Sequence, residues 1–158
     1  PLQMLMAHPK YRFHGKYNDI DWLTENYKVL GPDCYKYEPC WMNPKDAEVR
    51  GLQEGDIVLC RGERGKVLAG VRITKRLLEG VAWLSYGSWQ DPLSPVPGAI
   101  DRGGDGNVLS NNSPMSIHHV GGAFNSVLFD VEKADLDALA QQYPEGWAGK
   151  YRTWNREG

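Results

Sequence analysis

Hydrophobic and polar positions alternate over several short runs of this chain, a pattern typical of β-strands. The clearest run spans residues 66–74, where every second residue is apolar and one buried face is expected. Further strands are predicted over residues 2–7, 57–61, 81–86 and 126–132. Short strands separated by Gly- and Pro-rich turns predict a β-barrel-like domain.

The segment 41–59 predicts a strand, a short helix and a second strand. Asn43 suits the N-cap of the helix, and Pro44 suits its first position because the missing N–H is not needed there. Gly51 can adopt the left-handed conformation that ends a helix. The segment therefore indicates a compact crossover between two strands.

Two more helices and two loops complete the predicted organisation. The helices are expected over residues 19–26 and 133–143, and residues 26–40 are expected to form a connecting loop. Residues 87–106 are rich in Pro, Gly and Asp. A loop of this length is uncommon inside a compact domain and often has a function.

Composition narrows the function classes. The 158 residues suffice for one domain with a hydrophobic core. The net charge of -2 predicts no general attraction to nucleic acid or acidic membranes. Direct membrane insertion is not expected either, because no apolar run approaches the roughly 20 residues that span a bilayer. The chain starts at Pro1 rather than Met, which suggests a processed chain or a piece of a longer one.

The cysteines argue against a disulfide framework or a structural zinc site. The chain has an odd number of cysteines, Cys34, Cys40 and Cys60, and their spacing forms no Cys-x-x-Cys pair. Cys60 lies in an apolar strand and is expected to be a small buried hydrophobe. A disulfide between Cys34 and Cys40 is disfavoured but stays open, and cysteine usage does not identify the cellular compartment.

Several segments, taken together, point to one family. They are NPKDAEVRGLQEGDIV, GERG, ITKRLLEGVAWLSYGSW and GNVLS, in that order. From Leu2 to about Lys133 the chain resembles the C-terminal domain of molybdopterin oxidoreductases of the dimethyl-sulfoxide-reductase superfamily. The resemblance implies a mainly β fold, a double-psi β-barrel like that of aspartate decarboxylase, with short crossover helices. We place the barrel at residues 1–133 and a C-terminal helix and tail at residues 134–158.

The resemblance also implies a function. The domain would clamp a molybdopterin guanine dinucleotide in a larger molybdenum- or tungsten-dependent oxidoreductase, whose metal is held elsewhere. The implied partners are the remaining domains of the catalytic subunit and an iron–sulfur electron-transfer subunit. The chain alone is then not expected to be catalytic.

The first candidate site lies in residues 12–16, which resemble the family's Arg-x-His-Ser segment. Arg12 offers a bidentate fork for phosphate, and His14 offers an aromatic donor. Gly15 replaces the usual Ser and would let backbone N–H groups approach the cofactor. Judged without the family, these residues favour a solvated basic loop after a strand.

The second candidate site contains Asn107 and Ser110, which resemble the family's Asn-x-Leu-Thr segment. A carboxamide both donates and accepts, so Asn107 can read a guanine or pterin edge. The alternative is an Asn that only caps the end of the glycine-rich loop. His119 and Asn125 are expected to lie near the cofactor as well. A metal role for His118 and His119 is disfavoured, because adjacent strand residues point to opposite faces.

Two other functions stay open at this stage. The chain could be a natural single-domain subunit, similar to the small subunit of formylmethanofuran dehydrogenase. It could also be a double-psi barrel that binds peptide or nucleic acid as an interaction module. Titration with the cofactor or a guanine nucleotide would separate the module from the dinucleotide-binding domain.

Overall fold

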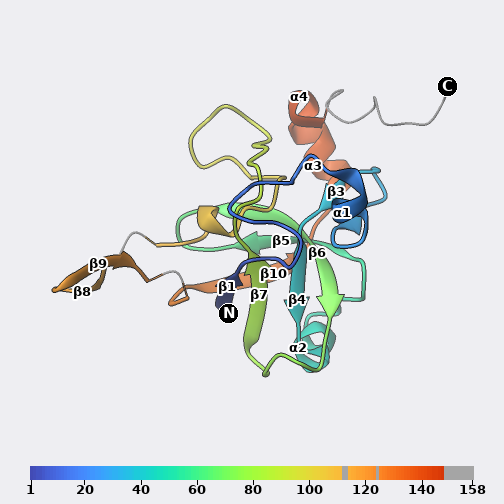
Figure 1. The fold of residues 1–158 in the computed structure, drawn as a ribbon. Helices are drawn as coiled ribbons and strands as arrows, with labels where there is room; N and C mark the ends of the chain where they lie inside the picture. Colours follow the sequence, from blue (N-terminus) through green and yellow to red (C-terminus); the bar gives the residue numbers. More distant parts are fainter. Residues whose placement is uncertain (112–113, 124, 148–158) are drawn as a thin grey trace.

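A closed β-barrel forms the body of the protein. The computed structural model describes residues 1–111, 114–123 and 125–147. Six strands close the barrel in the order β1-β10-β5-β6-β4-β7 (Figure 1). Their bounds are β1 (Leu2–Ala7), β4 (Pro39–Met42), β5 (Ile57–Arg61), β6 (Lys66–Ile73), β7 (Val81–Ser85) and β10 (Leu128–Lys133). The predicted fold class, a mainly β barrel with short helices, is confirmed.

The barrel mixes parallel and antiparallel pairs. Strand β1 runs parallel to β7, with Gln3 opposite Val81 and Ala7 opposite Ser85. Strand β4 likewise runs parallel to β6, whereas the other neighbours in the barrel are antiparallel. Because β1 and β7 are parallel, they end at the same edge. The loops that follow them, residues 9–18 and 87–106, therefore start side by side.

Hydrophobic side chains pack on both sides of β6. Val67, Ala69 and Val71 face the barrel interior, in one cluster with Leu2, Met4 and Phe129. Leu68 belongs to a second cluster outside the barrel, which includes Val29, Tyr37 and Ile100. The alternation in β6 predicted one buried face, but both faces are buried because loops cover the outer one. The predicted buried face of β6 is confirmed, and the burial of the opposite face is a feature that the alternation did not indicate.

The crossover helix forms as its sequence indicates. Helix α2 (Pro44–Val49) is capped by Asn43, whose side-chain oxygen accepts a hydrogen bond from the backbone N–H of Lys45 at 3.0 Å. Gly51 follows with a φ of 64°. Helix α1 (Asp21–Glu25) is shorter than predicted. Helix α3 (Leu136–Gln142) starts later than predicted, because the Asp135 carboxylate caps it.

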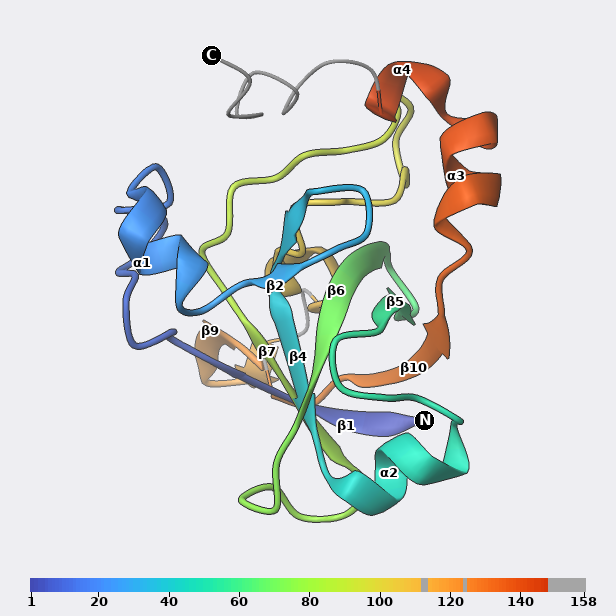
Figure 2. The ribbon, with the colours of Figure 1, turned by 90° about the vertical axis from the view of Figure 1, so that its right-hand side faces the viewer.

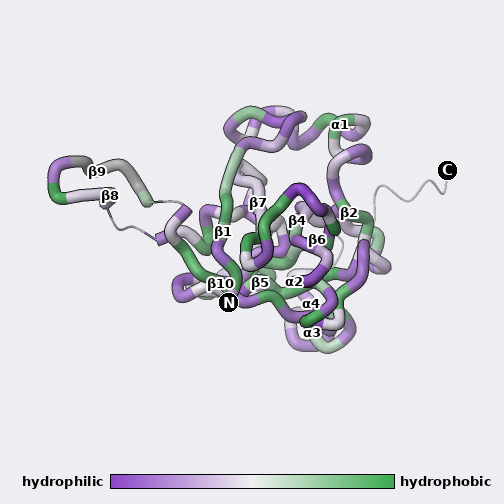
Figure 3. Tube along the Cα trace, turned by 90° about the horizontal axis from the view of Figure 1, so that it is seen from below, coloured by the Kyte–Doolittle hydropathy of each residue, from purple (hydrophilic) through white to green (hydrophobic). Residues whose placement is uncertain are grey.

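Several short elements have no counterpart in the prediction. Strands β2 (Val29–Leu30) and β3 (Lys36–Tyr37) pair inside the expected connecting loop. Strands β8 (Pro114–Ser116) and β9 (His119–Gly122) form a hairpin that projects from the barrel (Figures 1 and 3). Helix α4 (Pro144–Trp147) follows α3, and η1 (Gly106–Val108) is a single turn. Such elements are too short to produce a sequence period. The domain boundary after Lys133, at the end of β10, stays a prediction.

The cysteines are free thiols. Cys40 and Cys60 are buried in the barrel core, as expected for Cys60, and Cys34 is exposed. Contact with the Cys40 thiol, together with burial, raises the pKa of the Cys60 thiol.

Across the described ranges, no helix combines the length and the apolar character needed to cross a bilayer.

Candidate functional site

Two loops meet at the end of the barrel opposite α2 (Figure 2). The indole N–H of Trp89 donates to the carbonyl oxygen of Gly15 at 2.8 Å. The Asn18 carboxamide donates to the carbonyl oxygens of Gly15 and Gly87, both at 3.0 Å. We call the exposed surface of loops 9–18 and 87–106, together with η1, the rim.

His14 stands on the rim inside a group of aromatic rings. Its ring centroid lies 4.4 Å from that of His8, 4.6 Å from Phe13 and 6.0 Å from Tyr86. The residue is exposed and adopts a φ of 47°, a left-handed conformation uncommon for a residue with a side chain. The fold therefore presents an imidazole outward between aromatic neighbours.

Gly15 is required by the contact between the loops. Its φ is 82°, and a Cβ atom there would lie 3.3 Å from the carbonyl oxygen of Gly87. The family resemblance predicts that Gly15 lets a ligand approach closely. The structure adds a close approach by the chain's own backbone, and the ligand contact stays a prediction.

Arg12 is buried beneath the rim rather than exposed on it. Its guanidinium donates to the Glu38 carboxylate at 2.7 Å and to the carbonyl oxygen of Tyr86 at 3.1 Å. Its Nε, also buried, has no acceptor among the residues that the structure describes. Direct contact between Arg12 and a cofactor stays a prediction, but most of its donors already hold the loop.

Asn107 lies on the rim in η1, at the end of the second loop. The Asp105 carboxylate accepts hydrogen bonds from the Asn107 backbone N–H at 3.2 Å and from its side-chain nitrogen at 3.1 Å. This pair of bonds fixes how the carboxamide is turned. The second side-chain N–H and the side-chain oxygen Oδ1 of Asn107 can still bind a ligand.

A buried carboxylate organises the loop that leads to Asn107. Asp101 accepts hydrogen bonds from the backbone N–H groups of Asp91 at 2.6 Å, Gly103 at 3.1 Å and Asp105 at 2.9 Å. Burial raises the pKa of Asp101, although the three N–H bonds oppose the shift. The sequence predicted a long functional loop, and this hub shows why the loop has a defined shape.

The remaining candidates differ in what the structure shows of them. The Ser110 hydroxyl donates to the carbonyl oxygen of Asn107 at 2.8 Å, which closes the turn. The Asn125 side chain accepts from the backbone N–H of Met6 at 2.6 Å, at the edge of β1. The backbone of His119 lies in β9, but its side chain is outside the described part of the structure. Cofactor contact by these three residues stays a prediction.

The structure adds rim residues that the sequence argument missed. His8 and Phe13 stack with ring centroids 5.4 Å apart, and His8 lies 4.3 Å from Tyr86. Trp89 is 60 % exposed on the second loop, where its N–H donates to Gly15 of the first loop. Each of these side chains follows β1 or β7 closely in sequence, a position at which functional loops of a barrel begin. Their position directly after β1 or β7 was the sequence signal that could have identified them as rim residues.

The donor set suits an anionic, flat heteroaromatic ligand. The His14 imidazole and the Asn107 carboxamide lie on the rim, and aromatic faces stand next to His14, whereas the Trp89 N–H is already used between the loops. The carboxylates of Glu38, Asp101 and Asp105 are at most 5 % exposed, and each accepts hydrogen bonds from N–H donors. These negative charges are therefore neutralised or shielded beneath the rim and do not face an incoming phosphate.

Comparison with known proteins gives the family. Residues 2–128 match the family model described as the molydopterin dinucleotide binding domain. The chain is 39 % identical over 134 residues to the dimethyl sulfoxide/trimethylamine N-oxide reductase of Rhodobacter capsulatus, covering 84 % of this chain and 16 % of that protein. It is 34 % identical over 136 residues to trimethylamine-N-oxide reductase 1 of Escherichia coli O157:H7, covering 85 % and 15 %.

A solved structure supports the fold. Acetylene hydratase from Pelobacter acetylenicus superposes with a TM-score of 0.66 at 15 % identity, covering 85 % of this chain and 18 % of that chain. The chain spans about one sixth of the length of the curated relatives that it matches. The predicted resemblance and the dinucleotide-binding role are confirmed, and the role disfavours the interaction-module alternative. The chain belongs to the molydopterin dinucleotide binding domain family, the C-terminal domain of dimethyl-sulfoxide-reductase-type enzymes.

Proposed function

We propose that the rim holds a molybdopterin guanine dinucleotide, with His14 and Asn107 in direct contact with it. The observation that carries the proposal is the placement of these two exposed side chains on loops tied to each other at one end of the barrel. Residues on independent mobile loops could not define a ligand's position to the same precision.

The two side chains supply complementary chemistry. The imidazole of His14 can donate to a phosphate or a pterin edge, and the rings around it limit its freedom to turn. The carboxamide of Asn107 can pair with the donor–acceptor edge of guanine or pterin. Its orientation is set in advance by Asp105, which lowers the entropic cost of binding.

The domain's part in the reaction is positional. The bound cofactor supplies the two-electron redox chemistry, and the chain orients it and excludes water from one side. Since the curated relatives are named for dimethyl sulfoxide and trimethylamine N-oxide, we assign the parent enzyme to the reductases of S-oxides or amine N-oxides. Such a reduction removes the oxygen as water and consumes two electrons and two protons. An iron–sulfur subunit as electron donor stays a prediction.

Cofactor retention tests the proposal. In the full-length subunit, His14→Ala and Asn107→Ala are each expected to raise the rate of cofactor loss about tenfold, as expected when one hydrogen bond to a charged or polar group is removed. Samples are taken during dialysis, and acid hydrolysis of each sample gives the guanine nucleotide still bound per subunit. Gln141→Ala removes an exposed carboxamide from α3 and serves as the control. Retention equal to wild type in both rim variants would refute the proposal.

A further inference from the structure

Glu38 is a fully buried carboxylate beneath both rim loops. It lies between β3 and β4, and its side chain is 0 % exposed. Its two oxygens accept hydrogen bonds from Arg12 at 2.7 and 3.2 Å, and Lys28 Nζ lies 3.1 Å from one of them. Two cations therefore surround one carboxylate, and the cluster carries a net positive charge.

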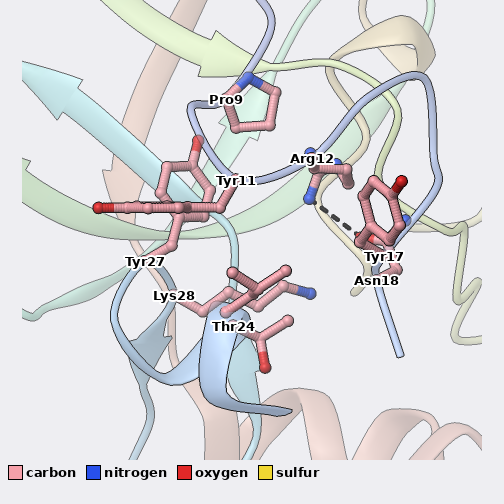
Figure 4. Close-up of a pocket in the computed structure, with 9 residues that line it drawn as sticks. Pro9, Tyr11, Arg12, Tyr17, Asn18, Thr24, Tyr27 and Lys28 are labelled. Atoms are coloured by element: carbon pink, nitrogen blue, oxygen red, sulfur yellow. Dashed lines mark hydrogen bonds between the residues drawn. The ribbon is translucent and has the colours of Figure 1, made fainter. Parts of the chain in front are cut away.

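Arg12 connects the Glu38 carboxylate to the first loop. The guanidinium that binds Glu38 also donates to the Asn18 side chain at 3.1 Å and to the carbonyl oxygen of Tyr86 at 3.1 Å. Figure 4 shows Arg12 and Asn18 on one side of a hollow, with Lys28 on another. The Arg12 fork thus ties the carboxylate to Asn18, which follows His14 in the same loop, and to Tyr86, the residue after β7.

The stem of Glu38 supports the second loop. Gly104 adopts a φ of 75°, and a Cβ atom there would lie 2.8 Å from the Cβ of Glu38 and 2.9 Å from the carbonyl oxygen of Leu68. The backbone at Gly104 therefore rests directly on Glu38. The next residue, Asp105, orients the Asn107 carboxamide.

A buried ion cluster is a poor source of stability, because desolvation offsets much of the attraction. Such a cluster can still define geometry, since a bidentate Arg–carboxylate pair fixes distance and angle together. We propose that Glu38 is a positioning residue. Through Arg12 it holds the loop of His14, through Gly104 it holds the loop of Asn107, and it thereby sets the spacing of the two cofactor contacts. This inference rests on the proposed function.

The test uses cofactor loss from the full-length subunit, measured as released guanine nucleotide, beside the melting temperature of the same samples. Glu38→Gln keeps the shape of the side chain and removes its charge. We expect cofactor loss about tenfold faster, the effect of weakening a charge-assisted bidentate pair. Glu132→Gln is the matched control, since Glu132 forms an exposed ion pair with Arg61 at 2.6 Å on β10.

A second comparison separates positioning from plain stability. Val131→Ala removes volume from the buried core of β10, outside both loops, and lowers the melting temperature. Each variant is assayed at the same interval below its own melting temperature. If Glu38→Gln loses cofactor no faster than Val131→Ala, the inference is overturned.

Arg12 provides an independent arm. Arg12→Lys keeps the charge and loses the fork, so it should also release cofactor faster, and its effect should not add to that of Glu38→Gln. Additive effects, or unchanged retention in Arg12→Lys when Glu38→Gln does not fold, would overturn the inference. His14→Ala and Asn107→Ala in the same assay test the proposed function separately. If they release cofactor and Glu38→Gln does not, only the positioning role fails.

Discussion

The Trp89 indole N–H and the Gly15 carbonyl oxygen, 2.8 Å apart, join two loops that are separated by 74 residues in the chain. Trp89 is 60 % exposed, so its ring contributes little to the hydrophobic core. The bond places the aromatic surface of one loop against the glycine turn of the other. Its main effect is therefore on the shape of the rim.

Removing this bond should loosen the rim while leaving the barrel intact. Trp89→Phe keeps an aromatic ring and loses the N–H. Cofactor loss from the full-length subunit should become about fivefold faster, equivalent to about 1 kcal/mol for one hydrogen bond. The melting temperature should stay close to that of wild type. Trp22→Phe, at a 67 % exposed position on α1, should change neither quantity. Equal retention in the two variants would contradict the prediction.

The Arg102 guanidinium should be replaceable by Lys only at a cost in stability. It lies 4.2 Å from the ring centroid of Tyr35 and 4.3 Å from that of Trp147, and it donates to Asp33 at 2.6 Å. A lysine cannot stack between two rings. Arg102→Lys should lower the free energy of unfolding by about 1–2 kcal/mol.

Urea unfolding measures that loss, and the summed emission of the six tryptophans, Trp147 among them, reports on the change in packing. The emission should shift to longer wavelength in Arg102→Lys, because the guanidinium no longer covers one face of the Trp147 ring. Arg76→Lys, at an exposed position in the turn after β6, is the control and should leave stability unchanged. A stable Arg102→Lys with unshifted emission would show that the stacking contributes nothing.

Acid should weaken the barrel partly through Asp56. Partial burial opposes its ionisation, but hydrogen bonds from Lys133 Nζ and from the Gln53 N–H, both at 2.9 Å, outweigh burial and lower the pKa of Asp56 below its usual 3.8. A carboxylate with a lowered pKa in the folded state stabilises that state above its usual pKa. This contribution is lost as pH falls from 3.8 through the folded-state pKa.

The substitution Asp56→Asn isolates this contribution. The variant should be less stable than wild type at neutral pH, and the difference should shrink as the pH falls through that window. Urea unfolding at a series of pH values measures it. Asp19→Asn, at an exposed position before α1, is the control. A difference between Asp56→Asn and wild type that stays constant with pH would contradict the linkage.

The outer cluster should tolerate no added volume at Gly70. A Cβ atom at this position in β6 would lie 2.3 Å from the Cβ of Val29. Gly70→Ala should therefore lower the free energy of unfolding by about 1–3 kcal/mol, the usual range for overpacking. Gly62→Ala is the matched control, because its Cβ would meet Leu109 at an ordinary 3.5 Å. Calorimetric melting of both variants checks the contrast.

How far the sequence predicts this fold depends on whether a feature is local. Strand β1 occupies the predicted residues 2–7, and β5 the predicted residues 57–61. Asn43 caps α2 as expected. In these cases neighbouring residues decide the backbone, through alternation or capping, so the pattern is visible along the chain. The pairing of β2 with β3 escaped prediction because two-residue strands carry no period.

What the sequence alone determined is the set of barrel strands, the family and the two segments that contain His14 and Asn107. The tertiary structure decided where the Arg12 side chain lies. The family resemblance implied a cofactor contact, which stays a prediction, and the structure shows the side chain buried against Glu38, 26 residues away. The reason is physical. The partner of a charged side chain is chosen by through-space desolvation and geometry, which depend on how distant segments pack.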